Sequence, residues 1–199
     1  MKEIFSSIAK GNLWSGTDSV SGTGSDLRNT IHLRRIMPLM LRALDVKILT
    51  DAPCGDFVWM SKIDISGLVE KYYGFDIVDD LIDKNNEKHS NESTITFGVA
   101  NICEDILPES DLIFCRDCLG HLSDESVVKA LNNFRASKSK WVAITHFIGM
   151  GANHPIIDGS WRPVNAEVYP FNLGSPTIIF MEHSPEASNK SISIWPLNN

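Results

Sequence analysis

Short apolar runs alternate with longer amphipathic stretches through the middle of the chain. Runs rich in β-branched and aromatic residues predict five strands, and stretches with apolar residues three or four positions apart predict three helices between them. The strands are predicted at residues 47–52, 71–77, 94–102, 111–117 and 140–147, and the helices at residues 54–63, 78–89 and 124–136. Because strands that alternate with helices form parallel sheets covered on both faces, the pattern predicts a three-layer α/β fold.

The N-terminal stretch before this alternation has a different composition. Residues 11–30 are rich in Gly, Ser, Thr and Asp and predict a loop. A helix is predicted at residues 27–44, with Ser25 or Asp26 as its cap and a kink at Pro38.

The last quarter of the chain also departs from the alternation. Residues 148–176 form a polar, proline-containing stretch, and a loop of this length in a compact domain is usually functional. Residues 177–183 and 191–197 follow as two strand-like runs, which predict an antiparallel pair at one edge of the sheet.

Composition and charge narrow the class of protein. The chain has 199 residues, of which 43% are hydrophobic and 22% charged, and this predicts one folded domain over residues 1–199. The net charge of −7 gives no support for a nucleic-acid partner. No run of about 18 apolar residues occurs, so we expect no membrane-spanning segment. The four cysteines, Cys54, Cys103, Cys115 and Cys118, lie among strand-like segments and not in a loop-rich disulfide framework, which predicts a reducing, cytoplasmic location.

Acidic residues close the first two predicted strands. Asp51 ends the first strand and is followed by Gly55, where the missing Cβ lets a ligand approach the backbone. Asp76 ends the second strand, and an acidic side chain about 20 residues beyond the glycine can meet the ribose hydroxyls of a nucleoside. Because ligands of such sheets bind beyond the carboxyl ends of the strands, the spacing predicts a nucleoside site there.

The loop after the first strand also distinguishes between nucleosides. Dinucleotide cofactors need several glycines whose amides hold the pyrophosphate, whereas this loop has Gly55 alone, together with Pro53 and Asp56. S-adenosylmethionine carries no phosphate and has a positive sulfonium and a positive amino group, which suit the carboxylates of Asp51 and Asp56. The loop therefore favours methyl transfer, and a nicotinamide-dependent dehydrogenase is the less favoured alternative.

Several short motifs follow one another along nearly the whole chain. They are Asp51-Ala-Pro-Cys-Gly-Asp-Phe, Gly74-Phe-Asp, Asn101-Ile, Asp111-Leu-Ile-Phe-Cys-Arg-Asp, Cys115-Arg-Asp-Cys-Leu-Gly-His-Leu-Ser and Trp161-Arg-Pro-Val-Asn. The first four, in this order, resemble the class I S-adenosylmethionine-dependent methyltransferases. The last two are similar to a small group of these enzymes associated with glycan and capsule synthesis, some of which are fused to glycosyltransferase domains. The resemblance implies a Rossmann-like sandwich with a seven-stranded, mostly parallel sheet in the order 3-2-1-4-5-7-6.

The resemblance also implies which residues hold the cofactor S-adenosylmethionine. Asp51 and Gly55 would lie beside its methionine part, and Asp76 would bind its ribose. Asn101 and Ile102 would face the adenine. The full set implied at the cofactor is Asp51, Pro53, Cys54, Gly55, Asp76, Ile77, Asn101, Ile102, Arg116 and Arg34.

A lid and a general base complete the implied site. Residues 1–30 would form the lid, and Arg34 would pair with the cofactor carboxylate. An acceptor alcohol must lose a proton during methyl transfer, so the site needs a base. His121 and Asp117, after the fourth predicted strand, are the first candidates, and His146 at the end of the fifth is the next. The alternative for His121 is a structural role as a helix cap.

The loop over residues 148–176 is expected to supply the acceptor pocket. Trp161 has a flat apolar face on which a sugar ring can stack, and Arg162 and Asn165 can make directional polar contacts. The alternative is that Trp161 and Phe171 only pin the loop to the core.

These patterns predict an enzyme that methylates a sugar hydroxyl in glycan biosynthesis, with a small-molecule or glycan acceptor, either alone or as part of a larger multidomain protein. The alternative acceptor is a phosphorylated or phosphoramidate metabolite, for which Arg162 is suited, and the alternative function is an inactive scaffold with the same fold. Cys115-x-x-Cys118 with His121 predicts no metal site, because no second pair of ligands follows.

Overall fold

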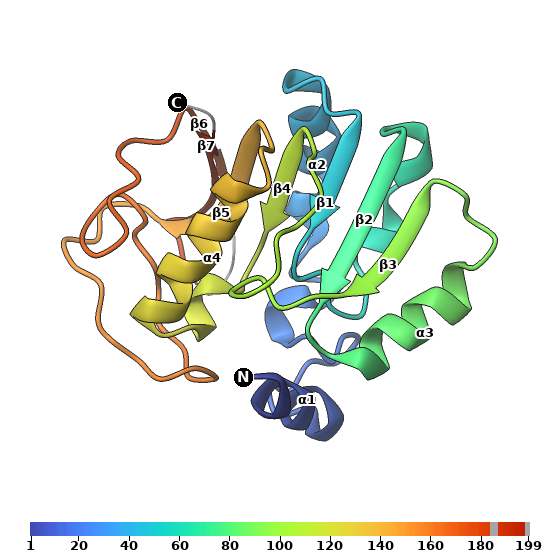
Figure 1. The fold of residues 1–199 in the computed structure, drawn as a ribbon, viewed down its shortest axis with the longest axis horizontal. Coiled ribbons are helices and arrows are strands. Elements are labelled where there is room, and N and C mark those ends of the chain that lie inside the picture. The colour runs from blue at the N-terminus through green and yellow to red at the C-terminus, as the bar shows by residue number, and fades with distance from the viewer. Residues whose placement is uncertain (184–186, 198–199) are drawn as a thin grey trace. The chain divides into compact units, whose positions relative to one another are not determined.

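The computed structural model describes residues 1–183 and 187–197, and within them seven strands form one sheet. The strands are β1 (Ile48–Asp51), β2 (Lys71–Asp76), β3 (Ile95–Val99), β4 (Leu112–Cys115), β5 (Trp141–Phe147), β6 (Ile178–Met181) and β7 (Lys190–Pro196). Their order in the sheet is β3-β2-β1-β4-β5-β7-β6 (Figure 1), which confirms the predicted Rossmann-like order. Within the described ranges, no helix is long and apolar enough to cross a membrane.

The first compact unit, Met1–Asn101, contains the three parallel strands β1, β2 and β3. Their register pairs Asp51 with Gly74 and Asp76 with Val99, so the carboxyl ends of the strands meet at one edge. The helix α3 (Asp79–His89) begins directly beyond β2, as predicted (Figure 1). The unit therefore places the acidic strand ends together.

The predicted helix over residues 54–63 is wrong. Two short 3-10 turns, Met60–Lys62 and Ile65–Gly67, connect β1 to β2 instead. Gly55 and Phe57 have φ angles of 57° and 58°, in the left-handed region that a right-handed helix excludes. In this conformation the Phe57 ring packs 5.0–5.2 Å from the buried Phe97 and Tyr72 rings, so core packing overrides the local helical spacing.

A cavity of about 370 Å³ lies between these turns and the end of α3. Its walls include Phe57, Ile63, Ile65, His89 and Glu92. None of the residues predicted at the cofactor or the acceptor lines it. The cavity is therefore separate from the candidate site described below.

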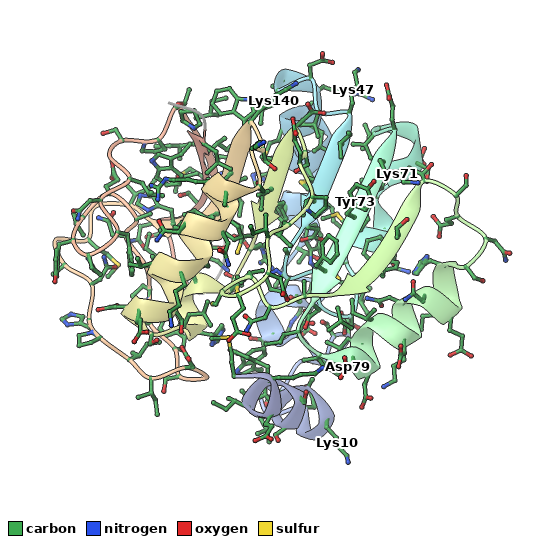
Figure 2. All side chains as sticks on the ribbon, viewed as in Figure 1. Lys10, Lys47, Lys71, Tyr73, Asp79 and Lys140 are labelled. Carbon is green, nitrogen blue, oxygen red and sulfur yellow. The ribbon has the colours of Figure 1, made fainter. Side chains whose placement is uncertain are left out.

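Two helices precede the sheet. The helix α1 (Lys2–Gly11) was not among the predicted elements, and the Lys2 ammonium pairs with Asp79 at 2.7 Å. Figure 2 labels Asp79, the first residue of α3, and Lys10 of α1. The helix α2 (Ile31–Ala43) begins four residues later than predicted and continues through Pro38.

The predicted capping of α2 by Ser25 or Asp26 is wrong. The residue before α2 is Thr30, and the buried Asp26 carboxylate accepts hydrogen bonds from the amides of Thr17, Asp18 and Ser19 at 2.8–3.3 Å. Three donors in the preceding loop are worth more to a buried carboxylate than one at a helix end. Burial by itself raises the pKa of Asp26, but the three amides outweigh burial and hold that pKa below its usual value.

The second compact unit, Ile102–Asn199, contains the other four strands. The strands β4 and β5 are parallel, and β5, β7 and β6 are antiparallel neighbours, which confirms the predicted antiparallel pair at the sheet edge. The helix α4 (Asp124–Ala136), which is drawn in front of β4 and β5 in Figure 1, begins where predicted. The Ser123 hydroxyl caps it by accepting a hydrogen bond from the Ser126 amide at 3.3 Å.

The Asp26 contacts generate a stability prediction. Asp26→Ala should lower the free energy of unfolding by about 1–3 kcal/mol at pH 7, because three loop amides lose a charged acceptor. A lowered pKa in the folded state means that this stabilisation is present above the unfolded value of about 3.9 and is lost as the pH falls through the folded value. Urea unfolding should therefore show a difference that shrinks below about pH 4. The exposed Asp83→Ala on α3 is the control, and equal losses in both variants would contradict the prediction.

Candidate functional site

The end of β1 carries a buried carboxylate. Asp51 is the last residue of the strand, and its Oδ2 atom accepts a hydrogen bond of 2.6 Å from the hydroxyl of Tyr72 on β2. Sequence reasoning did not assign Tyr72, although a tyrosine on a buried strand position needs a partner for its hydroxyl. The bond fixes the position of the Asp51 carboxylate at the end of the strand.

The end of β2 carries a second buried carboxylate, that of Asp76. Its Oδ2 atom accepts a hydrogen bond from the Gly55 amide and its Oδ1 atom accepts one from the Val78 amide, both at 3.0 Å. Burial raises the pKa of Asp76 to about 6, and the backbone amides oppose that rise. The Ile77 amide is a third backbone donor to this carboxylate, so about one of its four acceptor positions is left for a ligand.

The loop after β1 is held from two other directions. The Cys54 amide donates to the Phe75 carbonyl at 2.8 Å, and the side-chain amide of Asn85 donates to the Gly55 carbonyl at 2.9 Å. Asn85 was not assigned to the site from the sequence. The sequence pattern could have indicated it, because Asn85 is a polar residue on the apolar face of α3 that Leu81 and Ile82 define.

The remaining predicted cofactor residues of the first unit also lie at its strand ends. Pro53 belongs to the loop after β1, Ile77 follows β2, and Asn101 lies two residues beyond β3. The first unit thus brings together seven predicted residues: Asp51, Pro53, Cys54, Gly55, Asp76, Ile77 and Asn101. Ile102, the first residue of the second unit, is buried, and its carbonyl accepts a hydrogen bond from the Asn133 side chain at 2.9 Å.

The N-terminal segment contacts this loop. The Asp56 carboxylate accepts hydrogen bonds from the Ser19 hydroxyl at 2.9 Å and from the Val20 amide at 2.8 Å. The Asp56 amide donates to the Ser21 hydroxyl at 3.2 Å, and a Cβ on Gly55 would lie 2.3 Å from that same oxygen. Contacts of this kind are those expected of a lid on the cofactor loop, and the lid itself stays a prediction.

Arg34 lies on α2, and one end of its guanidinium donates to the Leu27 carbonyl at 2.9 Å. Its Nε atom is buried and makes no hydrogen bond to any residue that the structure describes. Its expected pairing with a cofactor carboxylate stays a prediction.

Four charged side chains of the second unit form a closed ring. Arg116 donates to Glu182 from Nε at 3.0 Å and also from Nη2, and Nη2 lies 3.1 Å from Asp117. The Lys190 ammonium lies 2.7 Å from Asp117 and 3.4 Å from Glu182. Positive and negative charges alternate around the ring, so it has no net charge. Sequence reasoning assigned Arg116 and Asp117 but missed their partners, which come from the ends of β6 and β7.

The Asp117 carboxylate is the part of the ring that faces solvent. Its side chain is 27% exposed, whereas those of Arg116, Glu182 and Lys190 are at most 5% exposed. Burial by itself raises the pKa of Asp117, but the Arg116 and Lys190 cations outweigh burial and hold it well below its usual range. A carboxylate with so low a pKa is a poor proton acceptor at neutral pH, which favours His121 as the base.

His121 lies in the short turn Leu119–His121 after β4. Its Nδ1 atom is 2.9 Å from the Ser160 carbonyl, so the neutral ring carries its proton on Nδ1 and its basic lone pair on Nε2. Burial lowers the pKa of His121, and the Ser160 carbonyl and the Asp117 charge oppose that effect without cancelling it. The neutral form that a general base requires is therefore favoured at pH 7.

The long loop is docked on the same turn. The Gly159 amide donates to the His121 carbonyl at 2.8 Å, and the Arg162 amide donates to the Gly120 carbonyl at 2.9 Å. Trp161 lies between these anchored positions, with its ring 6.2 Å from that of Phe147, and is 61% exposed. The loop thus presents the Trp161 indole beside the turn that carries His121.

Two other residues predicted at the acceptor are buried inside this loop. Arg162 donates to the Asp124 carboxylate at 2.6 Å and to the carbonyls of His154 and Leu122 at 2.7 and 3.1 Å. Asn165 donates from its side chain to the Met150 carbonyl at 2.5 Å. These contacts give both residues a role in shaping the loop, although the buried Nε atom of Arg162 has no hydrogen-bond partner among the residues that the structure describes.

His146 at the end of β5 is also buried, with 0% exposure. Its Nδ1 atom accepts a hydrogen bond from the Ala166 amide at 3.2 Å, and its Nε2 atom lies 3.6 Å from the Glu167 carboxylate. The ring therefore anchors the long loop, and its predicted part in proton transfer has no support from its accessibility.

No family model matches the chain, and no curated protein matches it in sequence. Solved structures do match over nearly the full length of both chains. The magnesium protoporphyrin IX methyltransferase of Synechocystis PCC 6803 with bound S-adenosylhomocysteine has a TM-score of 0.66 and 14% identity and covers 98% of this chain and 97% of its own. The N-methyltransferase NodS of Bradyrhizobium japonicum WM9, also in complex with S-adenosylhomocysteine, has a TM-score of 0.63 and 12% identity and covers 98% of both chains.

The fold is that of the S-adenosylmethionine-dependent methyltransferases. At these identities, 14% and 12%, the likeness concerns the fold and not the acceptor.

The His121 geometry generates a titration prediction. NMR of the imidazole nitrogens should show a midpoint below the usual value of about 6.5, with the proton of the neutral ring on Nδ1. The signals can be assigned with His121→Gln, whose spectrum lacks them. A midpoint at or above the usual value, or a proton on Nε2, would contradict the contact with Ser160.

Proposed function

We propose that this chain is an S-adenosylmethionine-dependent O-methyltransferase that methylates a hydroxyl group of a sugar in glycan biosynthesis. The observation that carries the cofactor assignment is the pair of buried carboxylates, Asp51 and Asp76, at the ends of neighbouring strands. The observation that supports the acceptor is the exposed Trp161 beside the turn of His121.

The first unit would supply hydrogen-bond acceptors to the cofactor. The Asp76 carboxylate would accept a hydrogen bond from a ribose hydroxyl, because a buried carboxylate gains most from donors that replace water. Asp51 suits the positive amino group of the methionine part. S-adenosylmethionine supplies an activated methyl group on a positive sulfur, and the structures of the fold neighbours with this cofactor or its product support the assignment.

The second unit has the group that the acceptor needs. Methyl transfer to an alcohol forms a carbon–oxygen bond, breaks the carbon–sulfur bond and releases the hydroxyl proton. His121 would take that proton on Nε2, and the Ser160 carbonyl would hold the ring and stabilise the imidazolium through Nδ1.

The way in which the loop holds Trp161 supports sugar recognition. Its neighbours in the loop are hydrogen-bonded to the turn at residues 119–121, so the indole is exposed and held in place at once. A rigid aromatic face loses little conformational entropy when an apolar sugar face stacks on it. The alternative is that Trp161 and Phe171 only pin the loop to the core. This role suits Phe171, which is buried, and not Trp161, which is exposed.

The alternative acceptor, a phosphorylated or phosphoramidate metabolite, rested on Arg162. That guanidinium is buried against Asp124 and two carbonyls. We therefore rank a neutral hydroxylated acceptor above an anionic one. An inactive scaffold is the remaining alternative, and the first of the two measurements below separates it from an enzyme.

Asp76→Asn tests the cofactor site. S-adenosylhomocysteine should bind the unaltered chain in a calorimetric titration, and the variant should bind roughly 10- to 150-fold more weakly, which is the loss of hydrogen bonds to a charged group. Asp83→Asn, on the exposed side of α3, serves as the control for charge. Unchanged affinity in Asp76→Asn would remove the ribose assignment, and no binding by a folded, unaltered chain would favour the scaffold.

His121→Ala tests the base. Turnover should fall roughly 10²- to 10⁴-fold while the affinity for S-adenosylhomocysteine stays within about twofold, because the base acts on the acceptor and not on the cofactor. In the unaltered enzyme the rate should fall as the pH drops below the lowered pKa of His121, since the protonated ring cannot accept a proton. Near-normal turnover in the variant would assign the proton to another group or to solvent.

A further inference from the structure

We propose that Asp117 is a substrate-binding residue that accepts a hydrogen bond from a second hydroxyl of the acceptor, and that Lys190 and Glu182 are positioning residues that hold its carboxylate for this task. The acceptor would then be a neutral vicinal diol, with one hydroxyl methylated and its neighbour bound by Asp117. This inference rests on the proposed function and names the substrate class of the same site.

The Asp117 carboxylate has three polar contacts with other side chains. Its Oδ2 atom faces the Lys190 ammonium at 2.7 Å and the Arg116 guanidinium at 3.1 Å, and its Oδ1 atom accepts from the Thr145 hydroxyl at 3.2 Å. A carboxylate has about four acceptor positions, so these contacts leave one, on Oδ1. Because the side chain is 27% exposed, this position is open to a donor from outside the protein.

Lys190 and Glu182, two other members of the ring, come from the last two strands of the sheet. Lys190 begins β7 and Glu182 follows β6, so the C-terminal hairpin brings two charges to the end of β4. Glu182 is needed because two buried cations against Asp117 alone would leave one positive charge uncompensated. Because the ring has no net charge, it favours neither a cationic nor an anionic substrate. Asp117 is then available as a hydrogen-bond acceptor for a neutral one.

The backbone at Asp117 adopts an unusual conformation. Its φ angle is 50°, a left-handed conformation that non-glycine residues adopt rarely, and its amide donates to the Thr145 hydroxyl at 2.8 Å. Such strain is retained where the surrounding structure specifies the conformation, often at functional sites. Asp117 lies two residues before the turn Leu119–His121, so the carboxylate and the His121 ring belong to the same short segment after β4.

The test uses the full chain with S-adenosylmethionine and defined probes: the methyl glycosides of mannose, galactose and rhamnose, each with its monodeoxy analogues. For a glycoside that is methylated, removal of the hydroxyl next to the methylated one should raise KM roughly 10- to 150-fold in the unaltered enzyme. In Asp117→Asn the KM for the parent glycoside should rise by a similar factor, and the same deoxy analogue should cost no more than about twofold further. Glu125→Gln, an exposed carboxylate of α4, is the matched control.

Equilibrium binding gives a readout that does not depend on turnover. Saturation-transfer NMR on the chain loaded with S-adenosylhomocysteine should show the same loss of glycoside affinity in Asp117→Asn, with cofactor affinity unchanged. Lys190→Met should raise KM for the diol and leave the deoxy analogue unaffected, and Lys190→Arg should restore the preference. A merely structural role would lower activity toward both substrates alike.

The outcomes separate this inference from the proposed function. If a glycoside is methylated but the neighbouring hydroxyl does not matter, or if its loss and Asp117→Asn act additively, the inference is wrong and the proposed function stands. If no glycoside is methylated although S-adenosylhomocysteine binds, the sugar acceptor and the inference both fall. Should Asp117→Asn not fold, the deoxy series with the unaltered enzyme decides alone, because a preference below about tenfold contradicts the inference.

Discussion

The two hydrogen bonds that the Asp76 carboxylate accepts from the Gly55 and Val78 amides tie the loop after β1 to the end of β2. A buried carboxylate stays ionised near neutral pH only when donors of this kind replace its water, and here they hold its pKa at about 6. The same loop then receives Asn85 from α3 and Ser21 from the N-terminal segment. The residues predicted at the cofactor in the first unit, apart from Asn101, lie in the loop or at the strand ends that these bonds join, so their positions depend on this closure.

The second unit contains a ring of four charged side chains. It buries three charges of a four-membered ring and leaves Asp117 at the surface, where the neighbouring cations make it a hydrogen-bond acceptor and not a base. Within the same unit the Ser160 carbonyl of the docked loop orients the His121 ring, which is the group proposed for proton transfer.

Local patterns in the sequence determined most of the secondary structure and part of the site. The spacing of apolar residues predicts the strands and α3 and α4 because it depends only on neighbouring positions. Asp51 and Asp76 could be assigned because they end strands, and parallel strands bring their carboxyl ends to one edge. The same local reasoning failed at residues 54–63, where the Phe57 side chain is taken into the core, and at Asp26, where loop amides displace the expected helix cap.

The tertiary structure alone decided which polar side chains remain available for chemistry. Arg162 and Asn165 have the residue types of a substrate site, yet both are buried and bonded to other groups of the protein, whereas Trp161, next to Arg162, stays exposed. The Arg116–Glu182 and Asp117–Lys190 pairs join residues 66 and 73 positions apart. Periodicity reports how a residue relates to its own helix or strand, but partners at such separations are set by the packing of whole elements, so only the folded chain shows which charges meet.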